Sequence, residues 1–314
     1  MSINNTLAFV FPGQGSQTVG MLADLASTHT EIKDTFDEAS ETLGRDLWSL
    51  AQEGPADKQN LTQNTQPLVL TASVAIWRIW QKQSTLKPAY MAGHSLGEYT
   101  ALVCADSLSF MDAVKLVEKR ACFMQQAVAE GEGSMAAILG LDLSVLMNIC
   151  AEAAENEVVS AVNFNAPGQI VIAGNTNAVN RAIELAKAQG AKRALALAVS
   201  VPSHCALMEP AATKLSAEMA DVSFSSPNIK VLHNTDVASH NDVASIKQAL
   251  EKQLYTPVRW TETIETLAKR EMTTIIECGP GKVLSGLNKR IDKSLTLHSL
   301  TDLNSFNKAL EALT

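Results

Sequence analysis

The sequence predicts an α/β protein with a mainly parallel sheet and a small inserted domain. Two patterns predict this class. Near both ends of the chain, short apolar strands alternate with helices, which is typical of a parallel sheet. In the middle, the elements follow in the order β-α-β-β-α-β, which is the ferredoxin-like pattern. The chain has 314 residues, of which 46% are hydrophobic and 18% charged, so it can bury a core of this size.

The elements of the large domain surround glycine-rich loops. Residues 7–11 form an apolar run that ends in Pro-Gly-Gln-Gly, which indicates a buried strand entering a tight loop. Residues 89–92 form a second short strand, followed by Gly-His-Ser-Leu-Gly and then by a helix over residues 98–105. Residues 67–80 predict a buried helix, and residues 273–278 predict another buried strand that ends at Gly-Pro-Gly.

The middle of the chain predicts the inserted domain. Its apolar runs indicate strands over residues 134–139, 158–163, 169–173 and 193–199. Helices are expected over residues 143–155 and 178–189, and an Asn-Ala-Pro-Gly turn joins the second and third strands. We therefore expect residues 1–129 and 201–314 to form a discontinuous large domain and residues 130–200 to form the small one.

Composition excludes several classes of function. The net charge of -8 argues against a broad nucleic-acid surface, so an acidic protein partner would need a local basic patch. No apolar run approaches the roughly 20 residues of a membrane span, and the N-terminus lacks the regions of a secretory signal. The five cysteines are scattered, and the six histidines lack metal-binding spacing. We expect a cytoplasmic monomer that binds no metal, nucleic acid or membrane.

A nucleophile motif lies between the second strand and its helix. Residues 93–97, Gly-His-Ser-Leu-Gly, match Gly-x-Ser-x-Gly, the turn that presents a serine hydroxyl at the top of a sheet. Glycines flank the serine because this tight turn leaves no room for a Cβ atom. The motif predicts Ser95 as a nucleophile; the alternative is a turn with a purely structural role.

Backbone N–H groups around the motif predict an oxyanion hole. The N–H of Leu96 starts the helix that follows Ser95, so it lies at the positive end of the helix dipole. A second N–H is expected from the loop Gly13-Gln14-Gly15, because glycines let a backbone approach closely. A dinucleotide-binding turn is the alternative for this loop, but Thr18 stands where its third glycine should be.

A serine nucleophile needs a base within hydrogen-bond reach, and His204 is the candidate. It follows the last strand of the small domain in a Pro-containing turn, where a histidine is otherwise a surface or capping residue. His94 competes, but it adjoins Ser95, so its side chain should point away from the hydroxyl. No acidic residue is evident as a third triad member, and a backbone or amide carbonyl is expected to orient the imidazole instead.

Arg120 is the candidate specificity residue. The predicted helix over residues 112–130 carries an apolar stripe, and its i+3 and i+4 spacing places Arg120 on the buried face. A buried guanidinium needs a carboxylate to accept its hydrogen bonds. That carboxylate is either a structural acid of the protein or part of a ligand.

Six spaced motifs together resemble one family. They are residues 11–17 (Phe-Pro-Gly-Gln-Gly-Ser-Gln), 93–98 (Gly-His-Ser-Leu-Gly-Glu), Arg120, 200–204 (Ser-Val-Pro-Ser-His), 253–257 (Gln-Leu-Tyr-Thr-Pro) and 277–282 (Glu-Cys-Gly-Pro-Gly-Lys). In this order, from about residue 7 to 290, they resemble the bacterial malonyl-CoA:acyl carrier protein transacylases. The one departure is Cys278, which stands where an aliphatic residue is expected.

The resemblance implies a hydrolase-like large domain, with the active site in a gorge between it and the ferredoxin-like domain. It implies that an acyltransferase moves malonyl groups from malonyl-CoA to acyl carrier protein for fatty acid synthesis; the thioester is a substrate and no cofactor is needed. The implied roles are nucleophile (Ser95), general base and acid (His204), malonyl carboxylate clamp (Arg120), oxyanion-hole N–H groups (Gln14 and Leu96), pocket amide (Gln66) and carbonyl that orients the base (Gln253).

Two other functions fit parts of the sequence. A serine hydrolase or thioesterase with the same turn would pass the acyl group to water. A binding module could retain the fold without catalysis. The buried Arg120 and the absence of a triad acid favour the transferase over the hydrolase.

Overall fold

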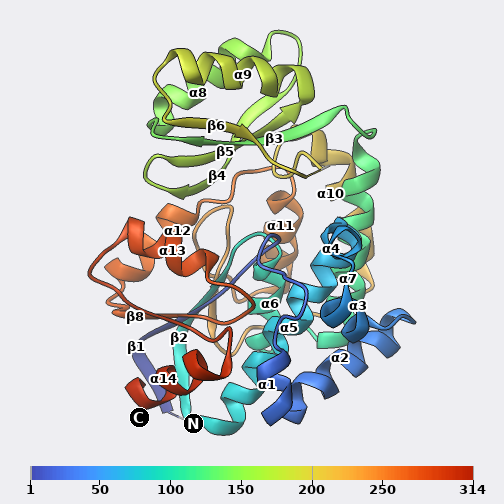
Figure 1. The fold of residues 1–314 in the computed structure, drawn as a ribbon, viewed down its shortest axis with the longest axis vertical. Coiled ribbons are helices and arrows are strands. Elements are labelled where there is room, and N and C mark those ends of the chain that lie inside the picture. Colours follow the sequence, from blue (N-terminus) through green and yellow to red (C-terminus); the bar gives the residue numbers. More distant parts are fainter. Residues whose placement is uncertain (1, 200, 314) are drawn as a thin grey trace.

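The computed structural model describes residues 2–199 and 201–313; Ser200, the first residue of the 200–204 motif, lies outside the described residues. Two sheets form its frame (Figure 1). The larger sheet has the strand order β7-β2-β1-β8-β9, and all of its pairings are parallel. Its strands are β1 (Ser2–Phe11), β2 (Leu86–Gly93), β7 (Lys230–Leu232), β8 (Thr274–Glu277) and β9 (Thr296–Ser299). The predicted parallel sheet is confirmed.

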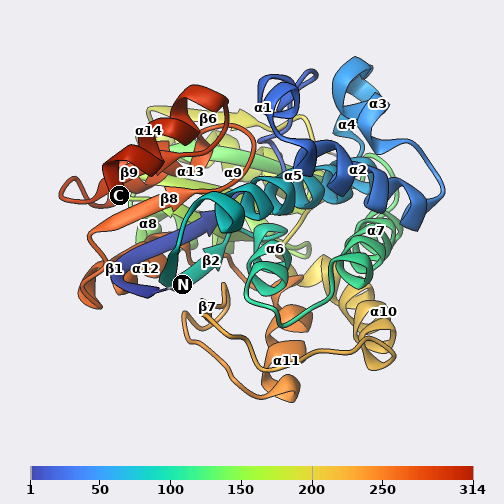
Figure 2. The ribbon, with the colours of Figure 1, turned by 90° about the horizontal axis from the view of Figure 1, so that it is seen from below.

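Helices cover both faces of this sheet. Those of the large part of the molecule are α1 (Ala23–Thr28), α2 (Thr30–Leu43), α3 (Leu47–Glu53), α4 (Ala56–Asn60), α5 (Thr62–Gln83), α6 (Gly97–Cys104), α7 (Phe110–Ala127), α10 (Glu209–Ala220), α11 (Val243–Gln253), α12 (Trp260–Lys269), α13 (Val283–Ile291) and α14 (Leu303–Leu313), with a short 3-10 helix at Ala206–Met208. Seen from below, α5 and α6 lie next to β1 and β2 (Figure 2).

Alternation along β1 explains this layering. Leu7, Phe9 and Phe11 join the core that includes α2, α5, α6 and α7, whereas Ala8 and Val10 join a second core with α12 and α13. Successive side chains of a strand point to opposite faces, so an unbroken apolar run is what a strand buried on both faces requires. All five residues are fully buried.

The second sheet is antiparallel and lies at one end of the molecule, at the top of Figure 1. Its strands are β3 (Gly133–Leu139), β4 (Val159–Ala166), β5 (Gln169–Asn175) and β6 (Arg193–Ala196), in the order β4-β5-β3-β6, and its helices are α8 (Leu143–Ala154) and α9 (Thr176–Ala188). The two helices pack on one face of the sheet. The β-α-β-β-α-β order is confirmed, while the domain boundaries at residues 130 and 200 stay a prediction.

The last strand of the small sheet is shorter than expected. The sequence predicts a strand over residues 193–199, but β6 ends at Ala196. Leu197 still donates its N–H to the carbonyl of Met135, and the N–H of Val199 then turns back to the carbonyl of Leu197. This turn ends the pairing with β3, and it directs the side chains of Leu197 and Val199 toward the cavity described below.

Backbone hydrogen bonds join the two parts. The N–H of Phe164, in β4, donates to the carbonyl of Val258, whose own N–H donates to the carbonyl of Val162, at 2.9 and 2.8 Å. Thr261 Oγ1 donates to the carbonyl of Phe164 at 2.9 Å. The segment after α11 is thereby tied to the small sheet, and α11 ends at Gln253.

Candidate active site

Ser95 lies at a sharp corner between β2 and α6. Its φ of 52° is in the left-handed region, which a residue with a side chain seldom adopts. The flanking glycines are required by space: a Cβ on Gly93 would lie 1.9 Å from the backbone of Gly97, and one on Gly97 would lie 2.1 Å from the carbonyl oxygen of Phe11. The strained backbone presents the hydroxyl to a cavity rather than to the core.

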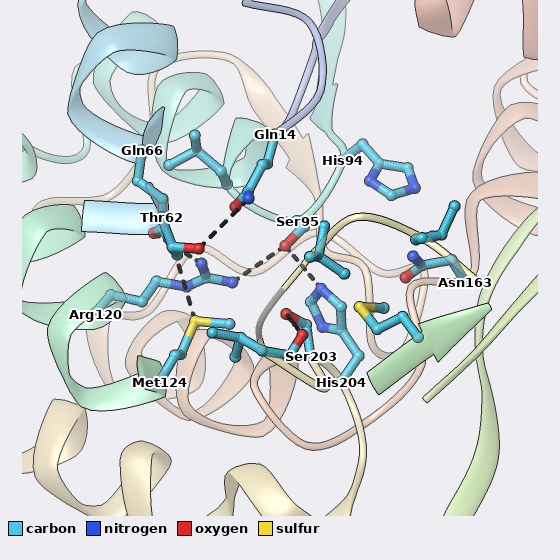
Figure 3. A pocket seen from close by; sticks show the side chains of 15 residues that line it. Gln14, Thr62, Gln66, His94, Ser95, Arg120, Met124, Asn163, Ser203 and His204 are labelled. Atoms are coloured by element: carbon cyan, nitrogen blue, oxygen red, sulfur yellow. Dashed lines mark hydrogen bonds between the residues drawn. The ribbon is translucent and has the colours of Figure 1, made fainter. Parts of the chain in front are cut away.

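The hydroxyl of Ser95 and the imidazole of His204 form a pair. Ser95 Oγ lies 2.8 Å from His204 Nε2 (Figure 3). The main-chain carbonyl of Gln253 lies 2.7 Å from His204 Nδ1. A carbonyl can only accept, so Nδ1 carries the proton and Nε2 is left free to accept the proton of Ser95. Burial lowers the pKa of His204 to about 3, and the charge of Arg120 adds to the effect. The imidazole is therefore neutral near pH 7, as a base must be.

Arg120 lies on the buried face of α7 and is only 1% exposed. Its Nη1 donates to Gln66 Oε1 at 2.8 Å, and its Nη2 donates to Gln253 Oε1 at 3.0 Å and to Ser95 Oγ at 3.1 Å. Burial lowers the pKa of this guanidinium, and the nearby Tyr99 and Glu98 act in the opposite direction. Among the described residues, no carboxylate contacts Arg120. The sequence left two partners open, an acid of the protein itself or a ligand carboxylate, and the first of these makes no direct contact with the guanidinium.

Two residues beside the cavity have main-chain N–H groups without a protein acceptor among the described residues. Gln14 and Leu96 both line the cavity, and within the described part of the chain neither main-chain N–H donates a hydrogen bond to protein. The side chain of Gln14 is held by Thr62, with Nε2 3.5 Å from Oγ1. An N–H without a protein partner is available to an oxygen of a bound acyl group.

The candidate site residues lie around one cavity of about 140 Å³. Six of the seven site residues predicted from the sequence line it: Gln14, Gln66, Ser95, Leu96, Arg120 and His204. The seventh, Gln253, contacts three of them through its main chain and its side chain. His94 also lines the cavity, but its Nε2 lies 2.8 Å from Asn165 Oδ1, so it is turned away from Ser95 as expected. Met135, Leu197 and Val199 come from the small sheet and the turn after it.

Sequence reasoning missed the residues that hold the corner. Asn234 Oδ1 accepts the N–H of Ser95 at 2.8 Å, and its Nδ2 donates to the carbonyl of Gly93 at 2.7 Å. Glu98 is fully buried behind it and accepts the N–H of Asn234 at 2.9 Å. Glu98 was part of a motif without a role, and Asn234, 139 residues from Ser95, carried no signal in the sequence.

Among the described residues we find neither a metal site nor a membrane-spanning helix. No group of three or more His, Cys, Asp or Glu side chains among them is placed to hold a metal ion. None of the described helices is long and apolar enough to cross a membrane. The fold and the pair of Ser95 and His204 resemble those of serine enzymes that handle acyl groups, because a hydroxyl paired with a neutral imidazole can form and break esters of the hydroxyl.

Comparisons with known proteins narrow this class. A family model described as "Acyl transferase domain" matches residues 8–300. A malonyl CoA-acyl carrier protein transacylase of Escherichia coli (strain K12) is 57% identical over 304 residues, which cover 97% of this chain and 98% of the relative. One of Bacillus subtilis (strain 168) is 46% identical over 308 residues, or 98% of this chain and 97% of the relative. The chain belongs to the malonyl CoA-acyl carrier protein transacylase family.

Solved structures agree with this assignment. The malonyl-CoA:acyl carrier protein transacylase of Xanthomonas oryzae pv. oryzae matches with a TM-score of 0.98 at 52% identity, over 99% of each chain. A malonyl-transacylase in complex with a type II PKS acyl-carrier protein matches with a TM-score of 0.96, also at 52% identity, over 98% of this chain and 99% of that one. The hydrolase-like fold with its ferredoxin-like insertion is confirmed.

Proposed function

We propose that this protein transfers the malonyl group of malonyl-CoA to the phosphopantetheine thiol of acyl carrier protein, through an ester on Ser95, and so supplies fatty acid elongation. The observation that carries the proposal is the position of Arg120. A buried guanidinium without a carboxylate partner lies 3.1 Å from the hydroxyl that would carry the acyl group. A malonyl group has its free carboxylate one methylene beyond the reacting carbonyl, within reach of such a cation.

The first half of the reaction acylates Ser95. His204 Nε2 takes the hydroxyl proton as Ser95 Oγ attacks the thioester carbonyl, and the N–H groups of Gln14 and Leu96 stabilise the oxyanion that forms. When the C–S bond breaks, the imidazolium returns the proton to the leaving sulfur, and coenzyme A departs. The carbonyl of Gln253 holds His204 in the tautomer that both transfers need.

The second half repeats these steps with a new thiol. The phosphopantetheine thiol of acyl carrier protein gives its proton to His204 Nε2 as its sulfur attacks the ester on Ser95. The tetrahedral intermediate then breaks its C–O bond, and Ser95 Oγ recovers the proton. The cycle needs no cofactor, since the coenzyme A thioester is itself the substrate. We also propose that the protein acts in the cytoplasm as a monomer, as the sequence predicts.

Arg120 and Gln66 would select the acyl group. Gln66 Oε1 accepts from Nη1 and orients the guanidinium, so that its charge faces the cavity. An acetyl group would leave the cation buried without a carboxylate. A site built for a polar group rejects an analogue that lacks it by about 10⁴-fold.

Intact-protein mass spectrometry tests the proposal. Incubation with malonyl-CoA should add one malonyl group to the wild-type chain and none to Ser95→Ala, and addition of holo acyl carrier protein should remove it. Acetyl-CoA should label the wild-type chain far more slowly. Rapid release of free malonate without carrier protein would favour the hydrolase, and an unlabelled Ser95 would favour a binding module.

A further inference from the structure

Glu98 is a buried acid next to the site, and none of the steps proposed above uses it. It lies in the first turn of α6 and is fully buried. Its Oε1 is 2.8 Å from His233 Nδ1, and its Oε2 accepts from the N–H of Asn234 and from Gln253 Nε2 at 2.9 and 3.0 Å. The N–H of Asn234 and Gln253 Nε2 can only donate to it, and His233 donates in the tautomer that carries its proton on Nδ1, so an ionised carboxylate satisfies every contact.

The side chain of Gln253 connects this carboxylate to Arg120. Its Oε1 accepts from Arg120 Nη2 at 3.0 Å, and its Nε2 donates to Glu98 Oε2 at 3.0 Å. The amide oxygen therefore faces the cation and the amide nitrogen faces the anion, so the amide dipole is aligned with both charges. Its Nε2 also donates to the carbonyl of Ser95 at 2.9 Å, which fixes the amide in this orientation.

We propose that Glu98 is the counter-charge of Arg120, acting through the amide of Gln253, and that this arrangement leaves the guanidinium open to the substrate carboxylate. The inference rests on the proposed function, because it takes malonyl-CoA as the substrate. A buried cation is costly without an opposite charge. A carboxylate in direct contact would neutralise the guanidinium and compete with the malonyl group, whereas one behind an amide stabilises the cation and leaves it in contact with neutral oxygens, which a substrate carboxylate can replace.

The arrangement has a consequence for affinity. When the site is empty, the positive charge of Arg120 and the negative charge of Glu98 balance each other. A malonyl carboxylate that binds then adds a second negative charge. Without the charge of Glu98 the empty site would hold an uncompensated buried cation, which the malonyl carboxylate would neutralise on binding. Loss of the Glu98 charge should therefore destabilise the free protein and tighten the binding of malonyl-CoA, but leave acetyl-CoA unaffected.

Calorimetric titration in a Ser95→Ala background tests this without turnover. Glu98→Gln keeps the size of the side chain and an acceptor for Asn234 and Gln253. We expect it to lower the Kd for malonyl-CoA by about tenfold, the order expected for a unit charge one amide away in a partly buried site. The Kd for acetyl-CoA should stay unchanged. The matched control is Glu277→Gln, because Glu277 is equally buried but binds the start of α13, and its loss should not alter the malonyl-to-acetyl ratio.

A double-mutant cycle separates the counter-charge from a packing role. Urea unfolding should show that Glu98→Gln costs clearly less stability when Arg120 is Met than when Arg120 is present. If Glu98→Gln alone does not fold, folding of Arg120→Met/Glu98→Gln supports the proposal, and failure of both variants to fold overturns it. Equal loss of affinity for both thioesters, or an equal stability cost in both backgrounds, also overturns it. A parent protein that does not prefer malonyl-CoA would instead refute the proposed function.

Discussion

At the scale of single residues, Arg120 is the side chain that contacts three of the other site residues. Its guanidinium reaches only neutral oxygens, of Gln66, Gln253 and Ser95, among the residues the structure describes. It also lies over the ring of Tyr99, with 5.5 Å from Cζ to the ring centroid, which adds a cation–π attraction. These contacts orient the cation and leave it without a carboxylate in direct contact, so an anionic acyl group can bind it.

Arg120→Ala should therefore lower malonyl transfer strongly and relax selectivity. We expect kcat/KM for malonyl-CoA to fall by about 10²–10⁴-fold, because a bidentate partner of the carboxylate is lost, while acetyl-CoA gains relative to it. Initial rates with both thioesters measure the ratio. Arg78→Ala is the control, since Arg78 pairs with Glu38 at the surface of α5. A malonyl preference that survives in Arg120→Ala would refute the clamp.

The residue scale also shows what local sequence can predict. Ser95 and Arg120 follow from short patterns, because a glycine-flanked turn and a helical stripe are properties of neighbouring residues. His204 needed the resemblance to a family before its surface role could be set aside. Asn234 and Glu98 could not be predicted, because their part in the site depends on a contact made across the whole chain.

At the scale of elements, the corner from β2 to α6 is a packing problem as well as a chemical one. Gly93 and Gly97 stand where backbone meets backbone, so a methyl group there cannot be accommodated by turning a side chain. The hydrogen bonds of Asn234 to both sides of Ser95 then hold the strained conformation. The corner thus depends on the strand, the helix and β7, after which Asn234 follows.

Gly93→Ala should abolish stable folding or cost more than about 3 kcal/mol, because the new Cβ would overlap the backbone of Gly97. Gly286→Ala in α13 is the matched control, since a Cβ on Gly286 would have no atom within 4 Å and alanine favours a helix. We expect the control to be neutral or slightly stabilising. Urea unfolding measures both, and wild-type stability in Gly93→Ala would contradict the steric argument.

Element types were predictable here and element ends were not. The apolar runs marked β1, β2 and β8 because both faces of the large sheet are covered. The end of β6 was missed because Leu197 and Val199, which follow it, line the cavity instead of continuing the strand. An apolar residue suits a buried strand and a cavity wall equally, so the sequence pattern cannot distinguish the two. α5 begins at Thr62, so Pro67 lies inside the helix and cannot donate to the carbonyl of Gln63; that carbonyl accepts instead from Arg45 Nη2 at 3.1 Å.

At the scale of the whole molecule, the site exists only where the two sheets meet. Ser95 comes from the large sheet and Met135 from the small one, while His204 follows the segment that leads back. The bonds between Val258 and β4 fix this arrangement five residues beyond Gln253, whose carbonyl lies 2.7 Å from His204 Nδ1. The sequence patterns predicted two domains, and the family resemblance implied a gorge between them. The hydrogen bonds that join the two parts could not be predicted, because they are made by backbone groups of Phe164, Val258 and Val162.

Acid stability of the whole protein should report the burial of His204. Its folded pKa of about 3 lies below the roughly 6.5 of an unfolded histidine, so between these values only the unfolded chain takes up the proton. Stability is therefore full above pH 6.5 and falls as the pH decreases, by up to about 1.4 kcal/mol per pH unit for this group. His94, whose pKa burial also lowers, adds to the decline.

Urea unfolding from pH 7.5 to 4.5 measures this decline, and His204→Gln should make it shallower because its side chain takes up no proton in the unfolded chain. Ser95→Ala is the control, because it keeps the buried imidazole and should keep the wild-type slope. The window ends at pH 4.5 because paired carboxylates with lowered pKa values, such as Glu262, begin to contribute below it. If His204→Gln and the wild type lost stability in parallel, the imidazole would take up its proton equally in the folded and unfolded states, which would contradict the lowering of its pKa by burial.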